Sequence, residues 1–232
     1  MRIVTLSDTH CQGSDVAVPD GDVLVHAGDH TFRGTQGEVD DALQWLDALP
    51  HRHKLLVAGN HDWFFDPDMP TSFRGWSLRR SLPVDELLAR YPRLTYLQDS
   101  GVDVDGLRFW GSPWQPYYWG WAFNFPQYPS GEPRRAWEKI PADTQVLITH
   151  SPPFGILDTN EEDPQRPNGC PALRARVNEL LGLRLHIFGH IHEGYGQQDV
   201  AAPPDSHIVS FINASICTRE YRPTNPPIVI DL

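Results

Sequence analysis

Five stretches of this 232-residue chain end in side chains that can bind metal ions or transfer protons. Each stretch starts with a short apolar run and then places Asp, Asn or His residues together. The residues concerned are Asp8 and His10, then Asp29, then Asn60, His61 and Asp62, then His150, and finally His190 and His192. Nitrogen and oxygen donors suit Mn²⁺, Fe or Zn²⁺, whereas Cu⁺ and iron–sulfur clusters prefer thiolates. Five such endings in one chain predict a metal site.

The candidate ligands are too many for one ion and suit two ions if one carboxylate bridges them. They are Asp8, His10, Asp29, Asn60, His150, His190 and His192. Two divalent ions bring four positive charges, and the two aspartates bring two negative ones, so the centre stays positive and attracts phosphate. Two metals about 3.5–4 Å apart can lower the pKa of a water and stabilise the oxygens of an in-line displacement. His61 is then free to protonate a leaving group.

Strands and helices must bring these residues together. Apolar runs predict strands at residues 2–7, 22–27, 54–58, 145–149 and 184–189, and later ones at 207–213 and 227–231. Apolar spacing predicts helices at 37–49, 83–90 and 171–181. Asp105-Gly106 predicts a hairpin between the runs 101–105 and 107–111. The alternation favours a layered α/β sandwich, in which sites collect beyond the carboxyl ends of strands.

Residues 112–130 interrupt this pattern with aromatic side chains. They are Trp114, Tyr117, Tyr118, Trp119, Trp121, Phe123, Phe125 and Tyr128, separated by Pro and Gly. We interpret the segment as an ordered loop, because so many aromatic groups are unfavourable in water. Two roles stay open and are compatible: a packed cap, or a wall on which a nucleobase stacks for about 1–3 kcal/mol.

Composition narrows the class of protein. The length suits a single domain over 1–232, and the formal net charge of −11 argues against a large nucleic-acid surface. Three cysteines suit a reducing compartment. We expect no signal peptide and no membrane span, because the strand pattern starts at once and no apolar run approaches about 20 residues. The expected location is the cytoplasm.

The motifs resemble the five signature blocks of calcineurin-like metallophosphoesterases. The blocks are Asp8-Thr9-His10, Gly28-Asp29, Gly59-Asn60-His61-Asp62, His150 and Gly189-His190-Ile191-His192, in the family's order. The flanking residues Gly111-Ser112-Pro113-Trp114, Glu193-Gly194-Tyr195-Gly196, Asn213-Ala214-Ser215 and Pro223-Thr224-Asn225-Pro226-Pro227 resemble the metallophosphoesterase-domain-containing proteins of animals. Those proteins are similar to class III cyclic-nucleotide phosphodiesterases.

The resemblance implies a four-layer αββα sandwich of two mixed sheets flanked by helices, with a dinuclear site. It implies that Asp8, His10 and His192 bind the first ion. Asn60, His150 and His190 would bind the second. Asp29 would bridge the two, and His61 would stay uncoordinated.

One position departs from the family pattern. Many relatives carry an acid three residues after the bridging aspartate, where it orients the catalytic histidine, and this chain has Phe32 there. Asp62, adjacent to His61, is the alternative support. Arg33 stands where protein-phosphatase-type relatives place a phosphate-binding arginine. His30, adjacent to Asp29, is a further candidate substrate contact.

We therefore expect a phosphodiesterase that hydrolyses a small nucleotide-like diester, by attack of a hydroxide that bridges two transition-metal ions. A phosphomonoesterase or protein phosphatase is the alternative within enzymes. A nucleotide-binding protein with little turnover is the alternative outside them, although all eight site residues are present. The substrate's identity, the metal and the oligomeric state stay open.

Overall fold

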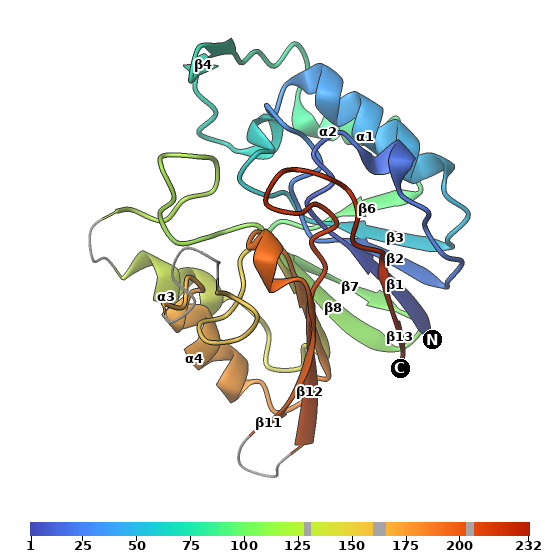
Figure 1. Cartoon of the computed structure of the whole chain (residues 1–232), viewed down its shortest axis with the longest axis vertical. Coiled ribbons are helices and arrows are strands. Elements are labelled where there is room, and N and C mark those ends of the chain that lie inside the picture. The colour runs from blue at the N-terminus through green and yellow to red at the C-terminus, as the bar shows by residue number, and fades with distance from the viewer. Residues whose placement is uncertain (128–130, 160–165, 203–206) are drawn as a thin grey trace.

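The computed structural model describes residues 1–127, 131–159, 166–202 and 207–232, and two β-sheets dominate it (Figure 1). The first sheet has the order β13-β1-β2-β3-β6. Its strands are β1 (Arg2–Leu6), β2 (Val23–His26), β3 (His53–Leu56), β6 (Leu94–Tyr96) and β13 (Ile228–Asp231). Strands β1, β2, β3 and β6 run parallel, and β13 is antiparallel to β1.

The second sheet has the order β11-β12-β10-β9-β8-β7. Its strands are β7 (Ser100–Val104), β8 (Leu107–Ser112), β9 (Val146–Thr149), β10 (Leu185–Phe188), β11 (Gly196–Ala202) and β12 (His207–Asn213). The four central strands are parallel, and the edge strands β7 and β11 are antiparallel to their neighbours. A small separate ribbon joins β4 (Ser72–Phe73) and β5 (Trp76–Ser77).

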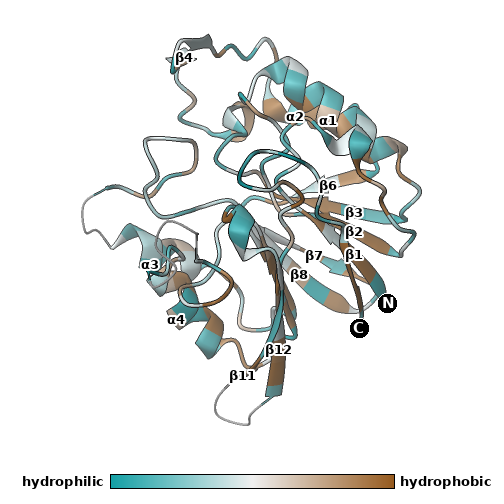
Figure 2. Cartoon of the chain, in the orientation of Figure 1, coloured by the Kyte–Doolittle hydropathy of each residue, from teal (hydrophilic) through white to brown (hydrophobic). Residues whose placement is uncertain are grey.

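The main core lies between the two sheets, whose strands are largely apolar (Figure 2). Alternation along the strands decides which side each residue faces. Val23 and Val25 of β2 pack toward the second sheet, while Leu24 packs outward against Leu46 of helix α1 (Gln36–Ala48). The two faces of one strand thus belong to two different apolar layers.

Helices cover the outer faces. Helix α1 begins at a capping box in which Thr35 and Glu38 satisfy each other's backbone N–H groups, and it lies on the first sheet with α2 (Val84–Leu88) (Figure 1). Helices α3 (Glu132–Trp137) and α4 (Pro171–Glu179) cover the second sheet, where Trp137 and Leu173 pack against its outer face.

This architecture confirms the predicted α/β sandwich of two mixed sheets flanked by helices. Most predicted elements are present within two residues of their expected ends, whereas β4, β5, β11 and α3 were missed. No helix in the described ranges is long and apolar enough to cross a membrane.

Candidate metal centre and active site

The predicted metal-binding residues all lie in loops that follow parallel strands. Asp8 and His10 follow β1, Asp29 follows β2, and Asn60 follows β3. His150 directly follows β9, and His190 and His192 follow β10. The carboxyl ends of these strands meet at one edge of the sandwich, which is where open α/β sheets place their sites.

The loop backbone adopts uncommon conformations at these positions. Asp8, His10, Asp29 and His190 have φ of 55°, 43°, 55° and 69°. Non-glycine residues rarely adopt positive φ, and where they do the surrounding structure must hold them, as at functional sites. The chain therefore turns sharply after β1, β2 and β10, where these side chains face the centre.

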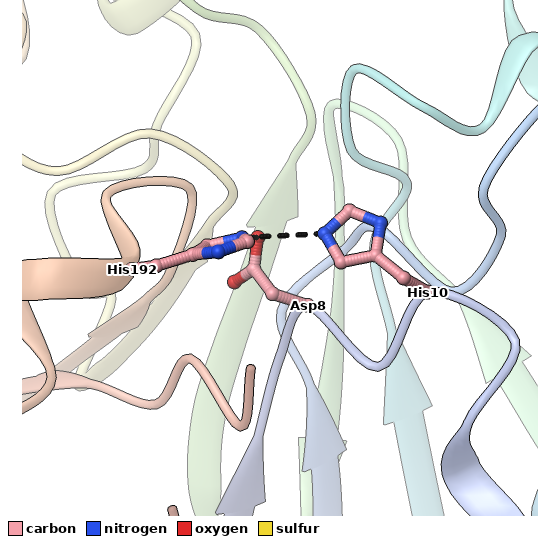
Figure 3. Close-up of side chains that lie close together, drawn as sticks. All are labelled: Asp8, His10 and His192. Atoms are coloured by element: carbon pink, nitrogen blue, oxygen red, sulfur yellow. Dashed lines mark hydrogen bonds and ion pairs between the residues drawn. The ribbon is translucent and has the colours of Figure 1, made fainter. Parts of the chain in front are cut away.

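Asp8, His10 and His192 form the first group of potential ligands (Figure 3). Their ligand atoms lie within 4.8 Å of one another. The Nε2 atoms of the two imidazoles face each other at 3.2 Å, and Nε2 of His192 lies 3.4 Å from Oδ1 of Asp8. These atoms converge on one point, as ligands of a single ion do.

Asp29 belongs to two further groups, one with His150 and His190 and one with His10 and His61. Its Oδ1 lies 3.5 Å from Nε2 of His150, and its Oδ2 lies 3.8 Å from Nε2 of His10. Each carboxylate oxygen thus faces a different group. Asn60 joins the His150 side, because its Oδ1 lies 2.9 Å from Nε2 of that ring.

Backbone carbonyls orient three of the histidines. Nδ1 of His10 lies 3.1 Å from the Thr31 carbonyl oxygen, and Nδ1 of His150 lies 2.9 Å from that of Ala27. Nδ1 of His192 likewise lies 2.9 Å from the carbonyl oxygen of Thr218. A carbonyl only accepts, so each Nδ1 carries the proton and each Nε2 is left as the donor atom for a metal.

Two glycines make room for the carboxylates. A Cβ at Gly189 would overlap Oδ2 of Asp8, and a Cβ at Gly59 would overlap Oδ1 of Asp29 and lie 2.6 Å from Cε1 of His150. Any larger residue at either position would push a candidate ligand out of place.

Burial and the charges of neighbouring side chains shift the pKa values of Asp29, His150 and His10. Burial alone would raise the pKa of the Asp29 carboxyl, but the charges of His150 and His61 hold it well below its usual range. Burial opposes charge on His150, yet the Asp29 carboxylate raises the pKa of this ring to about 9. Burial and the neighbouring His61 lower the pKa of His10 to about 4. The centre therefore holds ionised carboxylates beside rings that differ in proton affinity.

These donors fit divalent transition metals. Imidazole nitrogens, carboxylate oxygens and an amide oxygen converge in buried groups, and backbone carbonyls fix the orientation of three rings. Asp8 is further positioned by the Ser215 hydroxyl, which donates to its Oδ2 at 2.9 Å. The carboxylates of Asp8 and Asp29 are the anionic members of this set of candidate ligands.

His61 lies beside this centre with one nitrogen already engaged. Its Nδ1 lies 2.7 Å from the carbonyl oxygen of Phe32, and its ring stacks on Trp121 at a centroid distance of 4.1 Å. Its backbone N–H donates to Oδ1 of Asp29 at 2.8 Å. Phe32, which stands where many relatives carry an acid, thus supports the His61 ring through its backbone carbonyl.

Asp62 is fully buried, and its carboxylate contacts other groups. It accepts hydrogen bonds from the backbone N–H groups of Gly59, His30 and Thr31, from the Thr31 hydroxyl, and from Nδ1 of His30 at 2.9 Å. These bonds tie the loop after β2 to the loop after β3. The structure therefore places Asp62 as a clamp between two loops rather than against the His61 ring.

The two predicted substrate contacts lie outside the cavity at the metal groups. Arg33 is exposed, and its guanidinium lies 5.7 Å from the centroid of the Trp76 ring. His30 is 2% exposed and faces a different cavity.

The cavity at the centre has a volume of about 420 Å³. Asp29, Asn60, His61, His190 and His192 line one part of it. Asn168, Glu193, Arg219 and Tyr221 also line it, and the sequence analysis assigned none of them a role in the site. Arg219 and Tyr221 had no motif spacing to signal them, because a loop distant in sequence brings them to the centre, whereas Glu193 directly follows the candidate ligand His192.

The aromatic segment is partly packed and partly exposed at the cavity. Trp121, Phe123 and Phe125 are buried, whereas Tyr117 and Tyr118 are 44% and 46% exposed and line the cavity. Tyr128 lies outside the described residues.

Comparisons with known proteins agree with this geometry. The family profile described as calcineurin-like phosphoesterase matches residues 1–194. The chain is 42% identical over 240 residues to metallophosphoesterase domain-containing protein 1 of Homo sapiens, covering 100% of this chain and 71% of that protein. The Mus musculus protein of the same name gives the same values. One solved crystal structure, at 14% identity, has a TM-score of 0.63 and covers 91% of this chain and 89% of its own, which shows a shared fold.

Proposed function

The chain belongs to the calcineurin-like phosphoesterase family and is a metal-dependent hydrolase of phosphoric esters, and we propose that its substrate is a small nucleotide-like phosphodiester. The cavity beside the metal-binding groups carries this proposal. Its volume of about 420 Å³ suits a small molecule, since ligand sites commonly span about 300–1,000 Å³. Polymeric substrates are disfavoured by the net charge of −11.

The cavity offers contacts beyond those to the phosphoryl group. Asp29, Asn60, His61 and His190 line the cavity together with Tyr117 and Tyr118, and the Tyr118 ring lies edge-to-face with His190 at a centroid distance of 5.4 Å. Aromatic faces stack on nucleobases and tolerate different bases. A diester has two substituents, and the tyrosines would hold the one that does not leave.

Arg219 provides a cation at the same cavity. In an acidic chain such a charge matters, because the surface as a whole repels anions. A guanidinium can bind a phosphate through two parallel hydrogen bonds. We assign Arg219 the role of a substrate contact, which the sequence analysis had given to Arg33 and His30.

We propose two divalent ions, one held by Asp8, His10 and His192 and one by Asn60, His150 and His190, with Asp29 shared. The identity of the metals stays open between Mn²⁺, Fe and Zn²⁺. When bound, such ions lower the pKa of water and neutralise charge that develops on phosphoryl oxygens. The protein contributes the orientation of each ring and the exclusion of bulk water from a buried cluster.

His61 would protonate the leaving group. The Phe32 carbonyl accepts from Nδ1 at 2.7 Å, so a proton on Nε2 is the one available for transfer. Stacking on Trp121 fixes the ring plane. A general acid must be positioned before its proton affinity matters, and these two contacts supply the position.

The test is a hydrolysis screen with purified protein and added Mn²⁺, using matched chromogenic mono- and diesters and then nucleotides. We expect diesters to have the higher kcat/KM. A monoester with a kcat/KM ten times that of the best diester would favour the phosphomonoesterase alternative. Loss of diester activity in Arg219→Ala, but not in Arg33→Ala, would support the assigned contact.

The remaining expectations belong to the same proposal. The partner is a small phosphoester, and the cytoplasmic location stays a prediction that fractionation of cells expressing the tagged chain would test. The single domain over 1–232 likewise stays a prediction, which a single cooperative unfolding transition would support.

A further inference from the structure

A face of exposed aromatic rings lies beside His61, and Phe32, Trp76 and Tyr221 form it. Phe32 and Tyr221 are 37% and 39% exposed, and Trp76 is half-buried. Building on the proposed function, we propose that this aromatic face is a second stacking subsite, which holds an aromatic ring on the leaving group of the diester. The substrate class is then a linear diester with an aromatic ring on each substituent, such as a dinucleotide.

The position of Phe32 links the aromatic face to the site of proton transfer. Its ring centroid lies 5.8 Å from that of His61 and 5.5 Å from that of Tyr221. Both of these neighbours line the cavity at the metal groups. A general acid must lie within hydrogen-bond reach of the oxygen that it protonates. The part of the substrate bonded to that oxygen is therefore close to the Phe32 ring.

Trp76 extends the aromatic face away from the cavity. It belongs to the ribbon of β4 and β5, which stands apart from both large sheets (Figure 1). Its ring centroid lies 6.1 Å from that of Phe32 and 6.0 Å from that of Trp121, the ring on which His61 stacks. In the described part of the chain, none of the apolar core clusters includes Phe32, Trp76 or Tyr221. Packing of the core does not account for these rings, and exposed apolar patches of this kind mark binding sites.

A cation at the edge of the aromatic face favours an anionic ligand. The Arg74 guanidinium is exposed and lies 5.2 Å from the centroid of the Trp121 ring. Across the described ranges, Arg74 forms no ion pair with a carboxylate. A neutral hydrocarbon would gain nothing from this charge, whereas a nucleotide offers both a ring to stack and a phosphate to attract.

The two aromatic walls lie against different groups of candidate metal ligands. The Tyr118 ring contacts His190 at a centroid distance of 5.4 Å, and the Phe32 ring contacts His10 at 6.2 Å. A phosphoryl group between the ligand groups would direct one substituent of a linear diester toward each wall. In a cyclic nucleotide both ester oxygens belong to one nucleoside, so its single base could occupy only one wall. The arrangement therefore favours linear diesters over cyclic ones.

Isothermal titration of the metal-loaded chain with a dithymidine phosphinate tests the proposal. In this probe methylene groups replace both ester oxygens, so it cannot be hydrolysed. Two further probes each lack one of the two bases. The test variant is Trp76→Ala, and Trp76→Phe restores an aromatic ring. The control Phe154→Ala removes a phenylalanine that is 42% exposed and is not among the residues that line the cavity. Metal content and thermal unfolding of each variant check that the centre and the fold are retained.

We expect that removing one particular base weakens binding at least tenfold in the wild type and in Phe154→Ala, which corresponds to about 1.4 kcal/mol. In Trp76→Ala the same removal should cost less than threefold, and Trp76→Phe should restore most of the difference. The effect of removing the other base should be equal in all four proteins. An equal cost of both base removals in the wild type and Trp76→Ala, or no measurable binding at millimolar phosphinate, would overturn the proposal.

Hydrolysis of the matched natural dinucleotide identifies the leaving group. The released nucleoside should carry the base whose contribution to binding depends on Trp76, and release of the other nucleoside would overturn the assignment. Because the phosphinate reports binding without turnover, the two proposals can fail separately. The expected binding pattern without hydrolysis of any diester would refute the proposed function and support the subsite.

Discussion

Replacing His61 distinguishes a general acid from a metal ligand. Its ring lies in one potential metal group with His10 and Asp29, so the two roles compete for Nε2. The Nδ1 contact to Phe32 and the stacking on Trp121 would hold the ring whichever role it plays. If His61 is the acid, His61→Ala should keep both metals and lower kcat about 10²–10⁴-fold for an alkoxide leaving group. That loss corresponds to about 2.7–5.4 kcal/mol of barrier.

The assay is kcat measured across diesters whose leaving groups differ in pKa, with metal content determined on the same samples. The loss in His61→Ala should shrink sharply for p-nitrophenolate, which departs without a proton. A residue that only binds phosphate would cost similar amounts for every leaving group. In a plot of log kcat against leaving-group pKa, parallel lines for the wild type and His61→Ala would refute the general-acid role. Loss of metal in the variant would refute it as well.

Asp62→Asn provides the comparison within the same assay. The sequence analysis expected Asp62 to support the imidazolium of His61, which predicts a leaving-group-dependent loss. In the structure its carboxylate accepts bonds from His30, Thr31 and Gly59. We now expect a loss that is the same for all leaving groups, with a destabilisation of about 1–3 kcal/mol from unpaired buried donors. If kcat of Asp62→Asn depended on leaving-group pKa as it does in His61→Ala, Asp62 would support the imidazolium of His61 after all.

Three further predictions concern metal binding and stability. Asp29→Ala should lose both ions together, since each of its oxygens faces a different ligand group; one fully retained ion in elemental analysis would contradict sharing. Gly59→Ala should also reduce metal content, because the added Cβ would overlap Oδ1 of Asp29. The control Gly37→Ala should keep its metal, because a Cβ there would have no atom within 4 Å. Equal metal content in both variants would refute the idea that Gly59 makes room for the Asp29 carboxylate. Burial lowers the pKa of His186 to about 3, so the unfolded chain binds a proton that the folded chain excludes. Stability should therefore fall by up to about 1.4 kcal/mol per unit as pH drops from 6.5 toward 3, and urea titrations of His186→Gln should show a flatter slope.

The strand-end pattern was enough to predict much of the architecture. Short apolar runs followed by Asp, Asn or His mark the carboxyl ends of β1, β2, β3, β9 and β10, and parallel strands bring such ends to one edge. Strand β11 was missed because Gln197-Gln198-Asp199 has no apolar alternation. It forms through pairing with β12, which is a tertiary cause.

The contribution of Arg219 and Tyr221 to the cavity could not be predicted for a related reason. Arg219 and Tyr221 lie on a loop after β12, and nothing in their spacing indicates that the loop returns to the metal groups. Tyr221 nevertheless packs its ring against His10 and His192 at centroid distances of 4.8 and 5.4 Å. The support of His61 was hidden for another reason, because a backbone carbonyl has no sequence signature.

A neutral carbonyl as the hydrogen-bond partner of His61 also suits the charge of the cavity. A carboxylate in the place of Phe32 would add a negative charge beside a site that must hold a phosphate, in a chain whose net charge is already −11. The Phe32 carbonyl instead orients the ring without that charge. The nearest alternative acid, Asp62, is fully buried and bound by five hydrogen-bond donors behind the loops. Separating the clamp from the support keeps the Asp62 carboxylate away from the cavity, whose lining includes the carboxylates of Asp29 and Glu193.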